Sequence, residues 1–477
     1  MAAACNSPGQ QMVVPSAPAL SYQSRGLGPA DLTAHDLHAG GATSGAVAFN
    51  GGSQPVGNAL TLTGQPNPQA PPAEGTLFGV VKNPQGGTIY YCLTSSGSGR
   101  AAFEGGPGAA SAPATGPCAP LGVKPTGYGA RVDPLDFAAS DVALASTDYA
   151  TYKTYREPAS GTKWGEPVEL PSFAGQIVFS YRPQDFAKTY YTRVHLSTWT
   201  ACAIANGTIS DWNDPAITAD NGASVTKGVS APITFYFRSD NAATSYFLTY
   251  HLNSVCNRAW EKPYNSRPYQ YTGHSAAWAY GYNSIWPGPG SAALPNARFV
   301  GVIGNPGVIA AIQSTPFGFG YVEGAWAKTA DPPIAQAYVQ SGSHRHSPIW
   351  SDPTSSADTS ARLAAVTNAS ITYGGGSDEV PLPTSRPECI LYIDPLHFAG
   401  GGAPKGAYPI VEIGYLLFYG NNNGVHTFAK RHLLHFLSTA SARKIETAFG
   451  YTALGSSLQN AIDQAVQGGH GHAPCVQ

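Results

Sequence analysis

The sequence predicts an α/β protein with mainly parallel sheets, and three observations lead to that fold class. Runs of β-forming residues alternate with helical patterns along most of the chain, which is the order that gives βαβ units. Several strands end in small glycine and hydroxyl residues that lead directly into a helix, as at 88–103. The chain of 477 residues is too long for one hydrophobic core, so two or three domains are expected.

The composition excludes some classes of protein. Apolar residues make up 42% of the chain, enough for hydrophobic cores, whereas charged residues make up 11%, well below the usual share. The formal net charge of −2 provides no broad basic face for nucleic acid, so any anion has to be bound by a few placed donors. No run of 18 apolar residues occurs, so no membrane-spanning helix is expected.

The strongest candidate site is the turn 238–245. It follows a β-forming run at 231–237 and precedes a helical pattern at 246–252. Asp240 and Asn241 are candidates for the helix N-cap. Unpaired backbone N–H groups and the positive end of the helix dipole should therefore point into the same space, which is how proteins build anion sites.

Two side chains strengthen this interpretation of the turn. Arg238 offers a fixed fork of donors to an oxyanion, and Thr244 offers a hydroxyl group. The alternative is an ordinary strand-to-helix turn, in which Arg238 and Asp240 form a surface ion pair.

The strand-to-helix pattern recurs nearer the N-terminus. A glycine turn at 37–44 leads into a helical pattern at 45–50, and the strand 88–93 leads through hydroxyl residues into a helix ending near 103. A further strand, 136–141, ends in a carboxylate, which parallel sheets often place at their ligand-facing edge. Flexible connections are the alternative for each turn, and the repetition favours sites.

The remaining patterns place the other elements and loops. The aromatic-rich segment 256–291 is interpreted as a packing surface or a lid, with a sugar-binding platform as the alternative. Residues 341–387 are interpreted as loop-rich, with His344–His346 as a solvated loop tip. The segment His470–His472 is interpreted as disordered, with weak metal binding as the alternative. We also expect a flexible tether (1–36), exposed insertions (51–86, 104–130), helices (149–155, 195–207, 308–314, 424–439, 460–466) and strands (170–181, 318–323, 407–419).

The seven cysteines indicate an oxidising, extracytoplasmic compartment. No Cys-x2-Cys pair is present, so a zinc site is not indicated. Three disulfides plus a lipidated Cys5 would account for all seven cysteines, although spacing does not determine the pairing. The small residues before Cys5 are typical of the end of a bacterial lipoprotein signal, and an ordinary terminus with an isolated cysteine is the alternative. The disulfide candidates are Cys92, Cys118, Cys202, Cys256, Cys389 and Cys475.

Eight short motifs cover the chain from about residue 37 to 460. They are Gly40–Thr43, Ser96–Gly99, Asp136–Asp141, Gly207–Asn213, Arg238–Asp240, Gly304–Val308, Gly320–Glu323 and Tyr408–Ile410. In these motifs and their order, the chain resembles the phosphate-binding component of Pst-type ABC importers. It is especially similar to the longer, disulfide-bearing branch that includes the DING proteins.

This resemblance implies a periplasmic-binding-protein-like fold of type II. Two α/β domains with mainly parallel sheets would surround a ligand cleft, joined by hinge strands near 180–182 and 408–410. Domain I would be discontinuous. The expected boundaries are 37–181 plus 409–465 for domain I, 182–408 for domain II, and 466–477 for a C-terminal tail.

The resemblance also implies a site for inorganic phosphate. Asp141 would accept the proton that phosphate carries at neutral pH, and it would repel sulfate, which has no proton. Arg238 would neutralise ligand charge, oriented by Asp240. The remaining donors would be hydroxyl and backbone groups. The implied phosphate-binding residues are Thr43, Ser44, Ser96, Asp141, Arg238, Ala243 and Thr244, with Asp240 and Ala242 in supporting positions.

Three departures from the family pattern concern the site. Ala242 stands where the family usually has a serine whose hydroxyl meets the ligand, and Ala243 stands where glycine is usual. Losing one hydrogen bond to a charged group costs on the order of 1.5–3 kcal/mol, or roughly tenfold or more in affinity. Ser44 occupies a position where an aromatic residue or leucine is common.

The function that the resemblance implies is an extracytoplasmic solute-binding protein, periplasmic, cell-surface or secreted. It would deliver inorganic phosphate to an ABC permease of the inner membrane, without cofactor, metal, catalysis or nucleic acid. It would contact the membrane through a lipid anchor. A second hypothesis is a self-assembling or adhesive surface protein on the same fold, with a weakened site. A third is a phosphatase, although the Walker, His-Glu-x-x-His and Gly-x-Ser-x-Gly motifs are missing.

Overall fold

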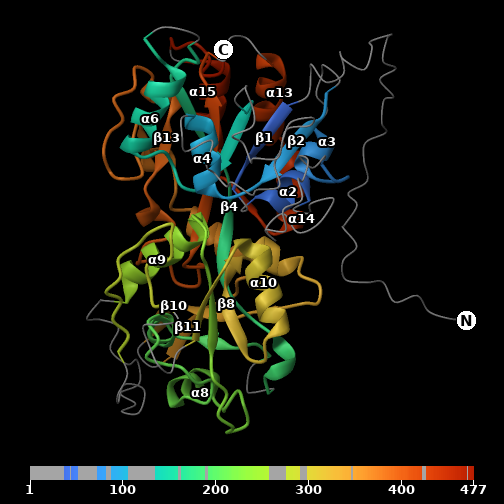
Figure 1. Cartoon of the computed structure of the whole chain (residues 1–477), viewed down its shortest axis with the longest axis vertical. Coiled ribbons are helices and arrows are strands. Elements are labelled where there is room, and N and C mark those ends of the chain that lie inside the picture. The colour runs from blue at the N-terminus through green and yellow to red at the C-terminus, as the bar shows by residue number, and fades with distance from the viewer. Residues whose placement is uncertain are drawn as a thin grey trace, which may run out of the picture. The chain divides into compact units, whose positions relative to one another are not determined.

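The structure is a computed structural model in which helices and strands alternate, as an α/β protein requires (Figure 1). Among the residues it describes, a helix with the length and apolarity needed to span a membrane is not found. The described residues are 37–42, 45–51, 72–81, 87–105, 135–159, 163–187, 192–256, 275–290, 298–344, 347–421, 426–469 and 471–477.

These residues form two compact units. The terminal unit comprises 37–174, Val366–Asp394 and Ile413–Gln477, and the central unit comprises Gly175–Ala365 and Pro395–Glu412. Two long strands contribute residues to both units, namely β4 (Pro167–Tyr181) and β14 (Val411–Tyr419). The chain therefore changes unit within β4 and within β14, close to the segments expected to be hinges.

The segment 366–394 is where the predicted domain boundaries differ from the structure. The predicted domain II of 182–408 includes it, but it belongs to the terminal unit. There β12 (Ile371–Tyr373) pairs antiparallel with β13 (Leu391–Ile393). The physical reason lies in the core, because this segment contributes Leu382 and Ile390 to a buried cluster with Phe103, Tyr152, Leu417 and Tyr419.

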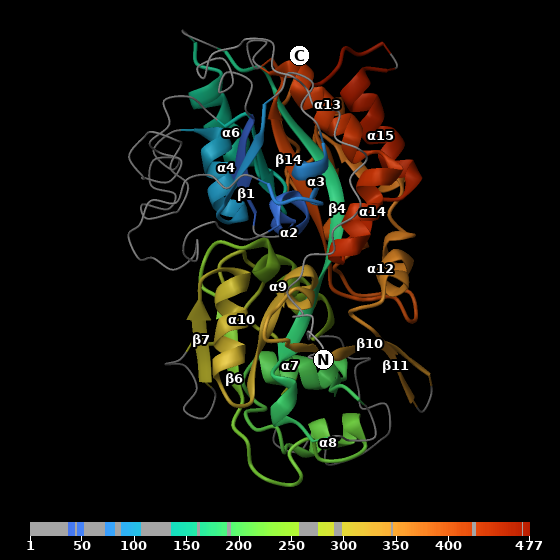
Figure 2. The ribbon, with the colours of Figure 1, turned by 90° about the vertical axis from the view of Figure 1, so that its right-hand side faces the viewer.

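The sheet of the terminal unit has the strand order β2-β1-β3-β14-β4. Strand β1 is parallel to both β2 and β3, whereas β14 is antiparallel to β3 and the short β15 is antiparallel to β4. Figure 2 shows α4 and α6 on one side of this sheet and α13, α14 and α15 on the other. The strands are β1 (Leu37–Gly41), β2 (Ile89–Leu93), β3 (Phe137–Ser140) and β15 (Thr452–Ala453). The helices are α2 (Ala46–Asn50), α3 (Leu77–Val80), α4 (Ser96–Glu104), α6 (Ser146–Arg156), α13 (Thr427–Leu437), α14 (Ala440–Phe449), α15 (Ser456–Gln467) and the 3-10 turns Asn368–Ser370 and Pro387–Cys389.

The sheet of the central unit has the strand order β4-β8-β6-β7, with β9 also paired to β4. Strand β6 is parallel to both of its neighbours, and β8 is antiparallel to β4. A second sheet has the order β11-β10-β5. The strands are β5 (His195–Leu196), β6 (Thr234–Arg238), β7 (Arg298–Val302), β8 (Gly318–Glu323), β9 (Ala335–Gln336), β10 (Tyr338–His344) and β11 (Ser347–Ser351). The helices are α7 (Thr198–Ala205), α8 (Pro215–Asn221), α9 (Ala243–Val255), α10 (Gly304–Ser314), α11 (Gly324–Lys328), α12 (Ser356–Leu363) and the 3-10 turns Pro183–Asp185 and Pro395–His397.

Two sequence predictions about loops are wrong. The described part of the predicted insertion 51–86, residues 72–81, contains α3, whose Phe78 is buried and stacks on Phe49 with ring centroids 4.9 Å apart. Residues 52–71 and 82–86 lie outside the described residues. The segment 341–387, expected to be loop-rich, contains β11, α12 and β12. In both cases hydrophobic residues bind otherwise polar segments to a core, which composition alone does not reveal.

The prediction that the folded part ends near residue 466 is also wrong. Cys475 and Val476 are buried. The backbone N–H of Cys475 donates to the carbonyl of Ala465 at 2.8 Å, and that of Gln477 donates to Gly420 at 3.0 Å. The C-terminal segment is therefore part of the terminal unit.

Two disulfides join candidate cysteines. Cys202 is bonded to Cys256 in the central unit, and Cys389 is bonded to Cys475 in the terminal unit. The other candidate side chains, Cys92 and Cys118, lie outside the described side chains, as do Cys5 and the predicted tether 1–36.

Candidate functional site

Arg238 is the buried centre of the site in the central unit. Strand β6 ends at Arg238, whose side chain is fully buried. Its Nε donates to Oδ1 of Asp240 at 2.7 Å, and its Nη2 donates to Oδ2 of the same carboxylate. This fork-to-fork geometry orients the guanidinium plane, as predicted, and it shows that the alternative of a surface ion pair is wrong.

The electrostatics of the pair keep both partners charged. Burial acts to raise the pKa of Asp240, but the Arg238 guanidinium outweighs it and holds that pKa below its usual value. Burial acts to lower the pKa of Arg238, but attraction to Asp240 outweighs burial and raises that pKa above its usual value. Asp240 also accepts a hydrogen bond of 3.0 Å from the backbone N–H of Gly304, which fixes the turn against the start of α10.

Helix α9 begins directly after this pair. Its N-cap is Ala242, so the predicted caps Asp240 and Asn241 are wrong. Asp240 is engaged with Arg238 instead, and the cap position carries no side-chain hydrogen bond. The backbone N–H groups of Ala243 and Thr244 donate to no acceptor within the described residues, so these two donors of the first turn are available for a ligand.

Three hydroxyl groups, those of Thr244, Tyr321 and Ser245, lie beside this turn in the central unit. The Thr244 hydroxyl accepts from Nη1 of Arg238 at 3.4 Å. The Tyr321 hydroxyl accepts from the backbone N–H of Arg238 at 3.1 Å and shares a hydrogen bond of 2.6 Å with the Ser245 hydroxyl. Sequence reasoning missed the roles of Tyr321 and Ser245, because β8 and α9 meet only in the folded chain.

Ser96 and Asp141 are brought together in the terminal unit. The Ser96 hydroxyl donates to Oδ2 of Asp141 at 3.1 Å and accepts from the Asp141 backbone N–H at 3.3 Å. Both side chains are buried. Gly99 lets α4 approach β3, because a Cβ there would lie 2.4 Å from the Ala139 carbonyl oxygen. This close packing brings the start of α4 to the end of β3.

Arg100 is a second feature that sequence reasoning missed. Its Nη1 donates to the Ser140 hydroxyl at 3.3 Å and to the Val142 carbonyl at 3.2 Å. Its Nε lies 3.2 Å from Oδ2 of Asp148. Arg100 thus fixes the residues on both sides of Asp141. The signal in the sequence was its place one helical turn after Ser96.

The predicted site residues are therefore found in two groups. Ser96 and Asp141 lie together in the terminal unit, and Arg238, Ala243 and Thr244 lie together in the central unit. The remaining two, Thr43 and Ser44, lie outside the described residues.

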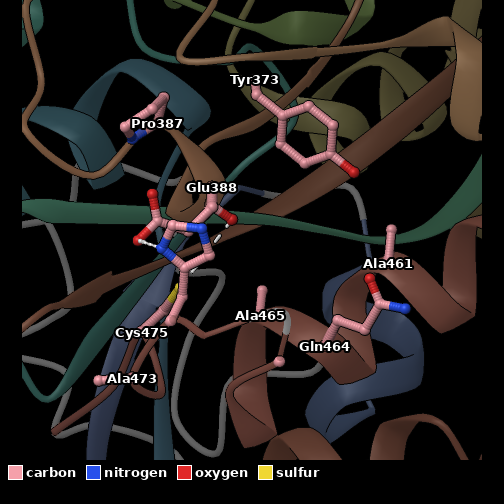
Figure 3. Close-up of a pocket in the computed structure, with 10 residues that line it drawn as sticks. Tyr373, Pro387, Glu388, Ala461, Gln464, Ala465, Ala473 and Cys475 are labelled. Atoms are coloured by element: carbon pink, nitrogen blue, oxygen red, sulfur yellow. Dashed lines mark hydrogen bonds and ion pairs between the residues drawn. The ribbon is translucent and has the colours of Figure 1, made fainter.

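A separate pocket of about 330 Å³ lies in the terminal unit (Figure 3). Tyr373 and Gln464 line it, together with Glu388, whose Oε1 lies 3.5 Å from Nδ1 of His472. Burial acts to raise the pKa of Glu388, but hydrogen bonds from the backbone and from Arg386 outweigh it and hold that pKa below its usual value. An ionised carboxylate in the lining disfavours a bound anion.

Possible metal ligands in the described part of the chain are its His, Cys, Asp and Glu side chains. Groups of three or more His, Cys, Asp and Glu side chains able to hold a metal ion are not found there. Arg345 and His346 of the predicted loop tip lie outside the described residues.

The fold and the two residue groups define the class of periplasmic-binding-protein-like α/β proteins. The sequence model of the PBP superfamily domain matches residues 84–387, and the chain belongs to this family. Named relatives are similar over part of their length. The phosphate-binding protein PstS 2 of Mycobacterium tuberculosis is 34% identical over 27% of this chain and 31% of the relative. The PstS protein of Methanocaldococcus jannaschii is 26% identical over 61% of this chain and 64% of the relative. The chain thus aligns with less than two thirds of the length of each of these relatives.

Solved structures share the fold at low sequence identity. The ancestral soluble variant of the Human Phosphate Binding Protein has a TM-score of 0.59 at 21% identity, covering 92% of this chain and 96% of the other. A high-affinity periplasmic phosphate-binding protein, PfluDING, solved with bound phosphate, has a TM-score of 0.56 at 18% identity, covering 92% and 96%. At these identities the likeness shows the fold.

Proposed function

We propose that the protein is an extracytoplasmic solute-binding protein for inorganic phosphate. The observation that carries this proposal is the fully buried guanidinium of Arg238, paired with the largely buried Asp240 at the start of α9. Beside it lie the backbone N–H groups of Ala243 and Thr244, which have no acceptor among the residues that the structure describes. Relatives of the same family are named phosphate-binding proteins. A guanidinium, a helix N-terminus and a hydroxyl group are together suited to a tetrahedral oxyanion.

Asp141 would set the preference for phosphate over sulfate. Hydrogen phosphate has one proton to donate, and a carboxylate accepts it, whereas sulfate can only be repelled. The Ser96 hydroxyl donates to this carboxylate. We propose that Ser96 orients Asp141 and that Thr43 and Ser44 add further donors.

Ala242 would reduce the number of donors. Its side chain is buried and its backbone N–H is taken by the Ser284 carbonyl at 2.8 Å. The site in the central unit therefore relies on Arg238, the N–H groups of Ala243 and Thr244, and the Thr244 hydroxyl. We expect a weaker site than one with serine at this position.

The biological role that we propose is delivery of phosphate to an ABC permease. The relatives named PstS and the solved protein described as periplasmic support it. The two disulfides fit an oxidising compartment outside the cytoplasm. We propose no catalytic activity, since the named relatives are binding proteins, and the hypothesis of a self-assembling surface protein finds no support among them.

Isothermal titration calorimetry of phosphate-stripped protein at pH 7 tests the proposal. We expect phosphate to bind and sulfate to bind at least about a hundredfold more weakly. The reason is that the buried carboxylate of Asp141 repels sulfate, which has no proton to donate to it. No heat with phosphate, or equal affinity for sulfate, would overturn the proposal.

A pair of variants ties the binding to the site. Arg238→Ala should abolish phosphate binding. The matched control is Arg362→Ala, because Arg362 is also a buried arginine of the central unit and its guanidinium binds the carbonyls of Phe398 and Gly400. Retained phosphate binding in Arg362→Ala would show that the loss in Arg238→Ala is specific to the site.

A further inference from the structure

Helix α9 is attached at both ends to parts of the central unit that sequence reasoning did not connect with the site. We propose that a brace, made of the Cys202–Cys256 disulfide and the segment 275–290, sets the positions of Arg238 and of the first-turn N–H groups of α9. The inference rests on the proposed phosphate site and names residues that position it.

The disulfide holds the C-terminal end of α9. Cys256 is the C-cap residue of this helix, and Cys202 lies in α7. The residue that caps the end of α7, Asn206, also holds the start of the segment 275–290. Its Nδ2 donates to the carbonyls of Ser275 at 2.6 Å and Ala277 at 2.8 Å. The same helix therefore anchors both parts of the brace.

The segment 275–290 holds the N-terminal end of α9 through its backbone. The N–H of Ala242 donates to the Ser284 carbonyl at 2.8 Å. The N–H of Asn283 donates to the hydroxyl of Thr249, in the second turn of the helix, at 3.1 Å. Two bonds of opposite direction thus fix the start of α9 to consecutive residues of the segment.

Trp286 connects the segment 275–290 to Arg238 through Tyr321. Its ring stacks on Tyr321, with centroids 5.6 Å apart, and on Phe237, with centroids 5.5 Å apart. Trp286 is 8% exposed and Tyr321 is fully buried. The Tyr321 hydroxyl accepts from the Arg238 backbone N–H and shares a hydrogen bond with Ser245 in the first turn of α9. Tyr321 therefore fixes the end of β6 to the start of α9.

The brace has a physical consequence for binding. An anion site gains affinity when its donors are already in place, because fewer groups have to be ordered on binding. Trp278 and Trp286 are buried, so the prediction of a packing surface for this aromatic segment is confirmed for these two residues. We infer that this packing stiffens a turn that lacks a capping side chain.

A comparison of two disulfide deletions tests the brace. The variant Cys202→Ser with Cys256→Ser removes the brace disulfide, and the matched control, Cys389→Ser with Cys475→Ser, removes the disulfide of the terminal unit. Hydrogen exchange followed by mass spectrometry reports the amides of 239–247, and calorimetry reports the dissociation constant for phosphate. We expect faster exchange and about tenfold weaker phosphate binding in the first variant, with neither change in the control.

A second comparison removes single hydroxyl groups. Tyr321→Phe deletes the hydroxyl that joins Arg238 to Ser245. Its control is Tyr236→Phe, because Tyr236 also lies in this sheet and its hydroxyl shares a 2.6 Å hydrogen bond with Thr315. Both variants should lower the melting temperature, but only Tyr321→Phe should weaken phosphate binding, by about tenfold. Equal phosphate affinities in these two variants would overturn the positioning role.

The two readouts separate the failure of the brace from the failure of the proposed function. Unchanged amide exchange at 239–247 in both the Cys202→Ser, Cys256→Ser variant and the Tyr321→Phe variant overturns the brace, regardless of the phosphate affinity. Faster exchange with unchanged affinity overturns its link to the site. Absence of phosphate binding in the unaltered protein overturns the proposed function, and exchange then still decides whether the brace holds α9.

Discussion

Glu169 accepts a hydrogen bond of 2.6 Å from the backbone N–H of Leu144, three residues after Asp141. Glu169 is fully buried in β4, so this bond attaches the loop that follows Asp141 to the sheet of the terminal unit. Burial raises the pKa of Glu169 to about 8, with the Leu144 N–H acting in the opposite direction.

The first prediction is that Glu169 makes the free energy of unfolding depend on pH. The variant Glu169→Gln should reduce this pH dependence. The folded protein keeps a proton on Glu169 that the unfolded chain loses near its reference pKa of 4.5. The resulting stability is present below that pH and is lost as the pH rises towards about 8. Glutamine is neutral throughout and can still accept from Leu144. Urea unfolding should show little difference at pH 5 and a variant more stable by roughly 2 kcal/mol at pH 8.

The control for this prediction is Glu166→Gln, since hydrogen bonds from Lys153 and Tyr149 outweigh burial and hold the pKa of Glu166 below its usual value. Its effect on the free energy of unfolding should stay constant between pH 5 and pH 8. A constant difference for Glu169→Gln as well would contradict the prediction.

The second prediction concerns the buried charge of Arg238. Asp240→Asn should lower the free energy of unfolding by about 3 kcal/mol, because it leaves a fully buried guanidinium without its anion. Glu388→Gln, in a partly exposed pair with Arg386 at 2.9 Å, should cost less than about 1 kcal/mol. Urea unfolding of both variants at pH 7 measures the difference, and similar losses would argue against a buried ion pair.

The third prediction concerns the selectivity of the site. Asp141→Asn should weaken phosphate binding roughly tenfold or more, because an amide replaces the acceptor of the ligand proton. Sulfate should lose less affinity or gain some, since the repelling carboxylate is gone. Calorimetric titrations with both anions give the ratio. An unchanged ratio of phosphate affinity to sulfate affinity would contradict the role of Asp141. The control is Asp378→Asn, because Asp378 is another carboxylate of the terminal unit and accepts a hydrogen bond of 3.0 Å from the backbone N–H of Ser146.

The fourth prediction is that Ala242→Ser strengthens the protein and its site. A serine N-cap can accept from the N–H of Ser245, the third residue of the helix, and stabilises a helix by about 1 kcal/mol. The N–H groups of Ala243 and Thr244 then stay available, and the serine hydroxyl can also donate to the ligand. The matched control is Ala145→Ser, because Ala145 is the N-cap of α6 and also lacks a side-chain cap hydrogen bond. Both variants should raise the melting temperature, whereas phosphate affinity should rise in Ala242→Ser alone.

The local elements of the site could be read from the sequence. The pattern at 231–252 predicted a strand, a turn with Arg238 and a helix, and the structure has β6, the turn and α9 there. The pattern at 88–103 likewise predicted β2 and α4. Hydrophobic periodicity and turn residues determine local structure over short stretches of chain, so the sequence alone predicts the elements that they form.

Contacts between distant segments were decided by the tertiary structure. Asp240 and Asn241 were expected to cap α9, but the N-cap is Ala242, because the carboxylate of Asp240 is engaged by the buried guanidinium of Arg238. Tyr321 and Trp286 reach the site from segments far along the chain. The segment 366–394 joins the terminal unit through hydrophobic burial that composition does not reveal. Sequence alone thus determined the elements and the candidate anion-binding turn, whereas packing, which is non-local, decided which side chains hold that turn in place.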